Sequence, residues 1–364
     1  MHLVRAGFVG LLGLLVLGAA VAVGADGDSR PQGAYFSGQE LSLAFGDRLR
    51  AMAGDPQPSA GAAPMAPHPE VDKEPPMTRP PRPPKGPPLP LHNIEGVSGG
   101  CSTPMAYFAN AGPEGTVVGM PAASYTFLLA GSKKVHTIAI SEVLWRRIEL
   151  SYAWNAVDLG SFPHAVNTFT DGAVHIRDHI YLHNINVRGL LIEENSHNLP
   201  LPAVVAGVHV KIGDGLDSID HRAGGLPSML GYNRQEGVDF TLTASKTWQD
   251  PFLHRPLITS LGVRFTKSAM IGWLGYGDDW KANLEANIAW VPTDFLAVAY
   301  EFRMKQQQYD TFPPLIKSED NWHTVLVAWL INDRMSLAGC FGVLGDIANT
   351  TENTAWGIQF KYEF

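Results

Sequence analysis

The chain has 364 residues, a formal net charge of −8 and 17% charged residues. This acidic balance argues against a nucleic-acid-binding protein, which would present a basic surface. Hydrophobic residues make up 45% of the chain, but beyond the N-terminus no apolar run approaches the ~20 residues of a transmembrane helix, so a membrane-spanning part would have to consist of strands.

The first 25 residues have the pattern of an export signal. Arg5 provides a positive charge, residues 6–23 are almost entirely apolar, and the small residues before Asp26 suit a cleavage site. An uncleaved inner-membrane anchor is the alternative, but acidic residues follow the apolar run at once. We therefore predict a cleaved signal peptide over residues 1–25, in a protein exported by a Gram-negative bacterium.

Two segments outside any folded core are predicted next. Residues 26–55 contain a short amphipathic helix that either docks on a partner or a membrane surface, or frays. Residues 56–90 hold fourteen of the chain's 27 prolines and are predicted to form a disordered, extended linker. Residues 33–90 are therefore a candidate binding segment for a periplasmic protein.

From residue 120 onward, apolar and polar residues alternate in segments of about ten residues, the length of a tilted transmembrane strand. In one segment Leu284, Ala286 and Ile288 alternate with Glu285 and Asn287. Twelve strands are predicted, over residues 123–131, 133–143, 145–158, 179–191, 202–213, 236–248, 257–267, 281–291, 294–304, 320–331, 335–344 and 354–364. An even number is typical of single-chain bacterial barrels.

Two features distinguish this pattern from a soluble β-sandwich, which also alternates. Short and long connections alternate along the chain, as the periplasmic turns and external loops of a membrane barrel do. Aromatic residues also gather at the segment ends, as interfacial girdles do: Trp145, Trp154, Trp248, Trp290, Tyr300, Trp322, Trp329, Trp356 and Tyr362. We therefore predict an all-β fold, an antiparallel transmembrane β-barrel in the outer membrane over residues 91–364. Residues 91–120 would add two strands, making fourteen, or else plug the lumen or cap its periplasmic mouth.

The polar side chains of the alternation would face the barrel lumen. The candidates are Arg147, Glu149, Asn155, His209, Lys211, Asp239, Glu285, Asn287, Glu301, Arg303 and Lys361. Both signs of charge are present, so pairing would fill much of the bore and favour a narrow channel, a gated passage or a solid scaffold. An arginine replacing Asn287 would face this lumen and is expected to be much milder than one replacing Ile288, which would face lipid.

The chain ends on the sequence WGIQFKYEF, which alternates as a closing strand would. Phe360, Tyr362 and the terminal Phe364 resemble the C-terminal signal by which outer-membrane barrels are recognised for assembly. The predicted partners are accordingly outer-membrane lipid and the barrel-assembly machinery.

Two groups of residues were considered as metal ligands. His175 and the histidines that follow it at intervals of four would lie roughly 13 Å apart on a strand, too far to share an ion. Asp214, Asp217 and Asp220 lie in a glycine-containing loop, but their spacing does not match an EF-hand. We therefore predict no bound metal and no cofactor.

Catalytic patterns were also considered, because outer-membrane enzymes exist. Ser196, His197 and Asn198 are consecutive, and neighbours in sequence point in different directions. No nucleophile elbow, zinc-protease motif or phosphate-binding loop is present. The sequence therefore predicts a protein that is not an enzyme. A hydrolase remains an alternative that needs a serine and a histidine within hydrogen-bonding reach.

The chain contains only two cysteines, Cys101 and Cys340. Export permits a disulfide, but two cysteines do not make a disulfide framework. Cys340 lies in an apolar strand pattern and is predicted to be a small residue facing lipid or the core.

Several segments resemble a bacterial family catalogued as domain of unknown function 3034: HNIEGVSGG, TPMAYFANAG, RIELSYAWNAVDLG, PAVVAGVHVKIGDG and GVDFTLTASKTW. The resemblance covers roughly residues 90–364. It implies an exported outer-membrane protein, and it implies no substrate and no catalytic residues. The predicted function is a narrow channel or transport-related barrel for polar molecules. The alternatives are an assembly protein that docks a periplasmic complex through its N-terminal region, and a hydrolase.

Overall fold

A computed structural model describes residues 88–313 and 315–364. The signal peptide, the amphipathic helix and nearly all of the proline-rich linker predicted above lie outside the described residues.

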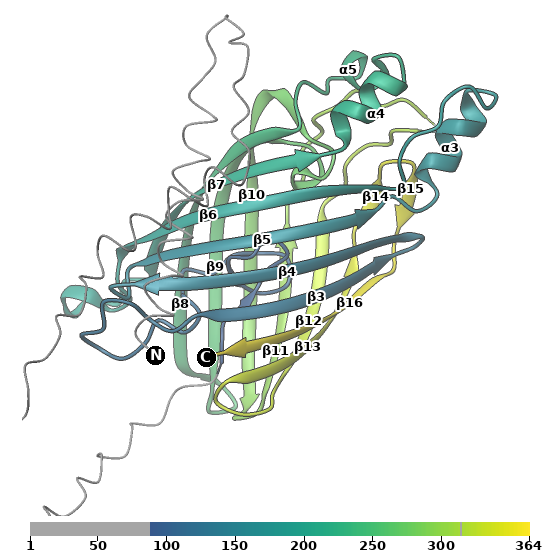
Figure 1. Cartoon of the computed structure of the whole chain (residues 1–364). Helices are drawn as coiled ribbons and strands as arrows, with labels where there is room; N and C mark the ends of the chain where they lie inside the picture. The colour runs from purple at the N-terminus through teal and green to yellow at the C-terminus, as the bar shows by residue number, and fades with distance from the viewer. Residues whose placement is uncertain (1–87, 314) are drawn as a thin grey trace, which may run out of the picture. The chain divides into compact units, whose positions relative to one another are not determined.

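Twelve antiparallel strands form a closed barrel, which confirms the predicted fold (Figure 1). Each strand pairs with the next, and the first pairs with the last across the registers Ala122 to Glu363 and Ala130 to Ala355. The strands are β3 (Ala122–Ala130), β4 (Lys133–Leu144), β5 (Ile148–Asp158), β6 (His179–Ile192), β7 (Ala203–Asp214), β8 (Glu236–Phe252), β9 (Arg255–Ser268), β10 (Tyr276–Thr293), β11 (Leu296–Arg303), β12 (Trp322–Leu330), β13 (Met335–Val343) and β16 (Ala355–Glu363). Closure leaves the barrel sheet without a free edge.

β8 and β10 extend furthest beyond their predicted ranges. β8 continues to Phe252 and β10 begins at Tyr276, because both extend past the membrane-length alternation into the turns and loops. A separate two-stranded sheet of β1 (Leu91–His92) and β2 (Ser98–Gly99) adds nothing to the barrel wall. Residues 91–120 therefore do not supply a thirteenth and fourteenth wall strand.

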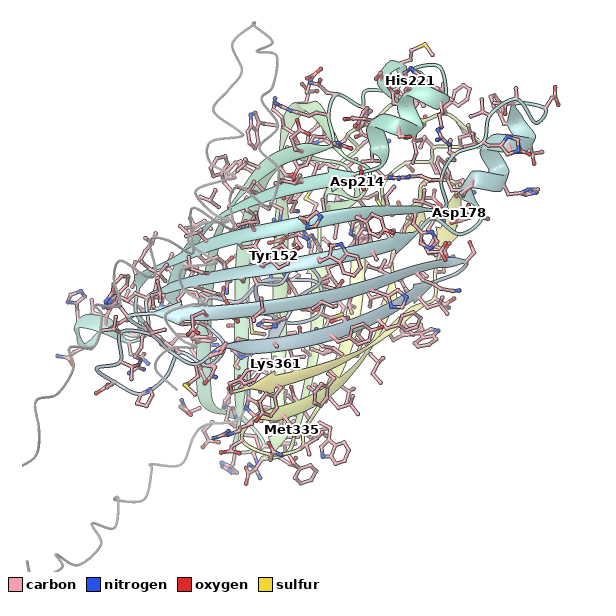
Figure 2. The ribbon with its side chains drawn as sticks, viewed as in Figure 1. Tyr152, Asp178, Asp214, His221, Met335 and Lys361 are labelled. Carbon is pink, nitrogen blue, oxygen red and sulfur yellow. The ribbon has the colours of Figure 1, made fainter. Side chains whose placement is uncertain are left out.

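The two ends of the barrel differ (Figure 1). The turn end carries Phe364 and the connections after β4, β6, β8, β10 and β12, including the 3-10 turn η1 (Ser196–Asn198). The loop end carries α3 (Phe162–Phe169), α4 (Leu216–Arg222), α5 (Leu226–Met229), the 3-10 turn η2 (Met270–Gly272) and the hairpin of β14 (Gly345–Ile347) and β15 (Thr350–Glu352). Figure 2 shows Asp178, Asp214 and His221 at the loop end, and Met335 and Lys361 at the opposite end.

The outer face of the barrel is apolar and the inner face is not. Along β16, Trp356, Ile358 and Phe360 are exposed, while Gln359 and Lys361, which alternate with them, are buried. The same alternation exposes Val325, Val327 and Trp329 on β12. Trp322 departs from the predicted aromatic girdle, because the first residue of β12 faces inward and is 2% exposed. No helix in the described part of the chain is long and apolar enough to span a membrane.

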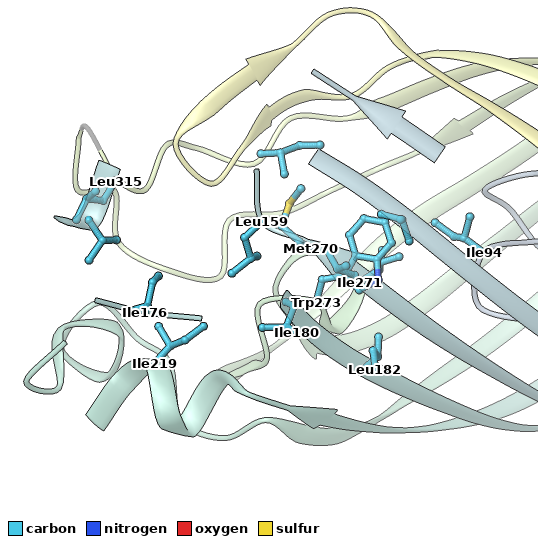
Figure 3. Packing of buried hydrophobic residues seen from close by; sticks show 14 of the residues in the cluster. Ile94, Leu159, Ile176, Ile180, Leu182, Ile219, Met270, Ile271, Trp273 and Leu315 are labelled. Atoms are coloured by element: carbon cyan, nitrogen blue, oxygen red, sulfur yellow. The ribbon is translucent and has the colours of Figure 1, made fainter. Parts of the chain in front are cut away.

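The loop end is closed by a hydrophobic cluster. Figure 3 shows Met270, Ile271 and Trp273 of the β9–β10 loop packed against inward residues of the wall such as Ile180 and Leu182. The cluster continues outward through Leu159, Ile176, Ile219 and Leu315 under the loop-end helices. On its inner side it meets Ile94, which belongs to the segment before the barrel.

Candidate functional site in the lumen

Residues 88–110, which we call the plug, occupy the lumen as a folded-back loop. The plug enters at the turn end, where the Lys361 ammonium donates hydrogen bonds to the carbonyl oxygens of Pro88 and Pro90. It also leaves at the turn end, where the Asn110 side chain donates to the carbonyl oxygen of Phe364 at 3.3 Å. Both ends of the plug therefore lie at the same mouth of the barrel.

The tip of the plug is a tight turn between β1 and β2. The Asn93 side-chain oxygen accepts hydrogen bonds from the backbone N–H groups of Glu95 and Val97, at 3.0 and 3.2 Å. Gly96 has a φ of 85°, and a Cβ there would lie 2.6 Å from the Cβ of Ala153 on the wall. Glycine is therefore required at the point where the tip touches the wall.

Glu95, at this tip, is surrounded by three cations from three strands. Its carboxylate is ion-paired with Lys211 of β7, with Arg264 of β9 at 3.0 Å and with Arg303 of β11 at 2.8 Å. Burial alone would raise the pKa of Glu95. The charges of Arg264, Arg303 and Lys211 outweigh burial and hold that pKa well below its usual value. Glu95 therefore joins the plug to three wall strands as a carboxylate.

Two wall carboxylates complete this buried charge cluster. Asp239 lies 2.8 Å from Lys211 and 3.2 Å from Arg264, and Glu285 lies 2.8 Å from Arg264 and 3.3 Å from Arg303. Three carboxylates, including that of Glu95, thus face three cations, and all six side chains are at most 2% exposed. Without Glu95, the wall would retain one uncompensated positive charge.

A second anchor is Glu301 on β11, which binds the return half of the plug. Its carboxylate accepts hydrogen bonds from the backbone N–H groups of Cys101 and Ser102 at 3.0 and 2.9 Å. It also accepts bonds from the hydroxyls of Ser102 and Thr103 at 3.1 and 2.8 Å. One wall carboxylate therefore satisfies a whole turn of the plug, and charge-assisted bonds of this kind are among the stronger hydrogen bonds in proteins.

A third anchor pairs Glu149 of β5 with Arg188 of β6. Glu149 accepts hydrogen bonds from the backbone N–H of Ser98, at 3.1 Å, and from its hydroxyl. The Arg188 guanidinium is ion-paired with Glu149 and donates to the carbonyl oxygen of Met105 at 2.8 Å. This pair holds both halves of the plug.

Wall amides bind three further carbonyl groups of the plug. Asn155 donates to Ile94 at 3.0 Å, Asn186 to Glu95 at 2.9 Å, and Gln359 to His92 at 2.6 Å. Buried backbone carbonyl groups need such partners. The polar wall is therefore complementary to the plug backbone.

The structure places ten of the eleven predicted lumen residues inside the barrel, each at most 4% exposed: Glu149, Asn155, His209, Lys211, Asp239, Glu285, Asn287, Glu301, Arg303 and Lys361. Arg147 differs. It lies in the turn before β5, its side chain is 52% exposed, and it pairs with Glu193 at 2.6 Å. β5 begins at Ile148, three residues later than the predicted strand, so this side chain stays at the rim.

Sequence reasoning missed three charged residues of the site, namely Glu95, Arg188 and Arg264. Arg264 lies on the same inward face of β9 as Ser260 and Gly262. The alternation in β9 could therefore have identified Arg264 as a lumen residue. Glu95 lies in a turn, where no periodicity marks a side chain as inward.

The filled lumen gives a physical reason to expect a cost for Asn287→Arg. The Asn287 amide donates to Glu301 at 3.0 Å, and it is among the nearest atoms to the space beside Gly100 of the plug. We expect an arginine here to displace the turn of residues 100–103 at a cost of about 1–3 kcal/mol, as for other overpacked cores. Faster proteolysis within the plug of the folded barrel would reveal this displacement. Asn283→Arg, on the same face of β10, is the positional comparison, and equal protease resistance of the two variants would contradict the expectation.

The candidate metal ligands lie at the loop end and have separate partners. Asp214 lies 3.5 Å from Arg177, Asp217 accepts a hydrogen bond from the Tyr232 hydroxyl, and Asp220 accepts one from Ser228 at 2.7 Å. His175 lies beside Asn167. Within residues 88–313 and 315–364, no three His, Cys, Asp or Glu side chains are grouped to hold an ion.

A serine–histidine contact does occur in the lumen. The His92 ring lies 3.0 Å from the Ser124 hydroxyl and 2.8 Å from the Ser141 hydroxyl. Each ring nitrogen thus faces a serine, whereas a catalytic triad uses one nitrogen to bind an orienting carboxylate. His92 and Ser141 are also fully buried. Ser196, His197 and Asn198 lie together in the η1 turn at the turn end.

Between the plug and the loop-end cluster lies an apolar cavity of about 70 Å³. Ile94 and Cys101 of the plug border it on one side, and Met270, Trp273 and Trp322 border it on the other. A second apolar cavity, also of about 70 Å³, lies under α4 and α5. These two cavities are thus lined mainly by apolar side chains, whereas the part of the lumen that holds the plug is polar.

The family model described as protein of unknown function (DUF3034) matches residues 90–361. No curated protein matches the chain.

Among solved structures, the KdgM porin aligns with a TM-score of 0.42 and 12% identity, over 67% of this chain and 99% of that one. The Acinetobacter baumannii outer membrane protein Omp33 aligns with a TM-score of 0.39 and 9% identity, over 68% and 99%. The outer membrane phospholipase A of Escherichia coli aligns with a TM-score of 0.33 and 7% identity, over 66% and 92%.

Proposed function

The chain belongs to the DUF3034 family of proteins of unknown function, and we propose that it is an outer-membrane channel closed by its own plug. The observation that carries the proposal is the match between wall and plug. The inward carboxylates, guanidinium groups and amides of the wall bind residues 88–110 from at least three directions, through Glu149, Glu301 and the cluster around Glu95. A passage would open when the plug leaves through the turn end.

The outer surface supports a location in the outer membrane. Large apolar side chains are 40% or more exposed on many strands, among them Ile138, Phe240, Leu261, Ile288 and Ile358. Such a belt is what the lipid-facing side of a membrane barrel presents. With the short turns on the periplasmic side, the loop end would face outward and the plug would be reached from the periplasm.

The wall beneath the plug supports polar molecules as the cargo. Withdrawal of the plug would uncover Glu149, Arg188, Lys211, Glu301 and Lys361, which are buried now. Rings of charged side chains select polar and charged solutes in channels. We therefore propose a gated passage for small or extended polar molecules.

The apolar closure at the loop end is connected to the plug. The Lys211 ammonium binds Glu95 and also donates a hydrogen bond to the carbonyl oxygen of Ile271, at 2.8 Å. Ile94 packs in the same cluster as Met270 and Trp273. Removing the plug would therefore weaken the closing loop of residues 269–275, so that both barriers would open together.

Glu301→Ala tests the gate, because it leaves several buried N–H and O–H donors of residues 101–103 without a partner. One such unsatisfied group costs about 1–3 kcal/mol, so the plug should leave at least about tenfold more often. We expect wild-type protein in planar lipid bilayers to open rarely and the variant to conduct much more often.

Glu193→Ala is the control, since Glu193 forms an exposed ion pair at the rim. Heat-modifiable gel migration establishes that each barrel is folded. A folded Glu301→Ala barrel that conducts no more than Glu193→Ala, with a thiol reductant present for both variants, would rule out the gated channel.

A second candidate function is docking of a periplasmic protein through residues 33–90. One observation favours it: the plug begins at the turn end, beside Lys361, and continues the proline-rich segment without interruption in sequence. A partner that holds this segment could therefore pull on the plug. Cross-linking from positions within residues 33–87 in intact cells tests this function, and it would be abandoned if no periplasmic protein were captured. A hydrolase has less support, because the His92 ring faces a serine at each nitrogen in a filled lumen.

A further inference from the structure

We propose that Cys101 and Cys340 form a disulfide that fastens the plug to the barrel wall. The inference deepens the proposed function, because it concerns the regulation of the same plug. The two sulfur atoms lie 2.9 Å apart although 239 residues separate them in sequence. They are the chain's only cysteines.

The contact is fixed by its surroundings on the plug side. Cys101 is 6% exposed, and its backbone N–H donates to Glu301 at 3.0 Å. Ser102 and Thr103, the next residues, bind the same carboxylate. The Cys101 sulfur therefore faces the wall because the turn that carries it is held by hydrogen bonds.

The contact is also accommodated on the wall side. Cys340 lies on β13, opposite Gly357 of β16. A Cβ on Gly357 would lie 3.0 Å from the Cys340 sulfur and 2.2 Å from the Leu128 side chain. The glycine thus leaves the space in which the two sulfur atoms meet.

Export provides the oxidising conditions that the bond needs. A thiolate of the pair attacks the disulfide of a periplasmic thiol oxidoreductase and forms a mixed disulfide, releasing one oxidant sulfur as a thiol. The second cysteine thiolate then attacks the mixed disulfide at the sulfur of the first, and the other oxidant sulfur leaves as a thiol. Two cysteine thiols are oxidised, and the oxidant disulfide takes up their two electrons and two protons. Because Cys101 is buried in the folded barrel, this exchange takes place before the barrel closes.

The bond would divide the plug into two parts. Residues 101–110 would stay attached to β13, whereas residues 88–100, which include Glu95, could still withdraw through the turn end. Reduction would release the whole plug. The disulfide therefore sets how far the passage opens, and we expect conductance steps to become larger after a membrane-permeant reductant is added.

Thiol counting tests the bond independently of conductance. Outer membranes are treated with N-ethylmaleimide in denaturant, cleared of reagent, and then labelled with a maleimide–polyethylene glycol, with or without prior reduction. Wild-type protein should gain no polymer adduct without reduction and two adducts after it. Mass spectrometry of unreduced peptides should find Cys101 linked to Cys340.

Cys340→Ser is the matched control, since its remaining thiol is blocked at the first step and should give no polymer adduct in either condition. If mass spectrometry finds both wild-type cysteines alkylated by N-ethylmaleimide without reduction, the disulfide is overturned. That outcome leaves the gated channel standing, because the gate is tested by the conductance of Glu301→Ala.

Discussion

Glu95→Gln is expected to release the plug tip. It should weaken docking of the plug by about 3–5 kcal/mol, the usual cost of removing one partner of a buried ion pair. The carboxylate is 1% exposed and is bound by Lys211, Arg264 and Arg303. Glutamine keeps the shape but not the charge, so Asp239 and Glu285 would face three cations alone. The expected result is a folded barrel in which residues 88–100 become sensitive to protease.

Glu193→Gln is the matched control, because it makes the same substitution in an ion pair whose side chains are more than half exposed. Exposed pairs contribute about 0–1 kcal/mol, so this variant should keep its plug protected. The measurement is the rate of limited proteolysis at the plug, read by mass spectrometry on barrels that remain heat-modifiable. Equal rates for the two variants would mean that the charge cluster does not hold the tip.

Ile288→Arg is expected to destabilise the barrel itself by about 2–4 kcal/mol, the cost of an arginine facing the middle of a bilayer. Ile288 lies within β10, pairs with Tyr300 and Thr259 on its two sides, and is 44% exposed on the outer face. The guanidinium would therefore have to reach toward an interface or carry water with it. Equilibrium unfolding in lipid vesicles, titrated with guanidinium chloride, measures the loss.

Ile331→Arg provides the comparison, because it makes the same substitution at a different depth. Ile331 follows β12 at the turn end and is 39% exposed, and near an interface an arginine costs only about 0–1 kcal/mol. The difference between the two variants thus depends on depth in the membrane. Equal losses would show that the outer face of β10 does not contact lipid.

The barrel could be predicted from sequence because the alternation that specifies each strand involves residues close together in the chain. A period of two fixes which side chains of β10 and β16 face the same way, and the spacing of these runs gives the twelve strands. Arg147 and Trp322 were misplaced because they stand at strand ends, where alternation cannot say whether the wall has already begun. Turn and loop geometry decides such positions.

The site was predictable only in part, for a different physical reason. Alternation identifies the inward face, but it does not say what fills the space in front of that face. The plug has no periodicity, and its partners are distant in sequence: Cys101 binds Glu301, and Glu95 binds Arg303. Ten of the eleven predicted lumen residues are therefore inside the barrel, where they bind the chain's own N-terminal segment or other wall residues instead of facing water.

The shared mouth of the plug's two ends has a consequence for biogenesis. Pro88 and Asn110 both lie at the turn end. The plug is therefore a loop that enters and leaves the barrel at the same end and does not pass through it. β3 follows the plug in sequence and pairs with β16, the last strand to be synthesised. The sheet must therefore curl around a loop that is already in place, or admit it afterwards from the same side.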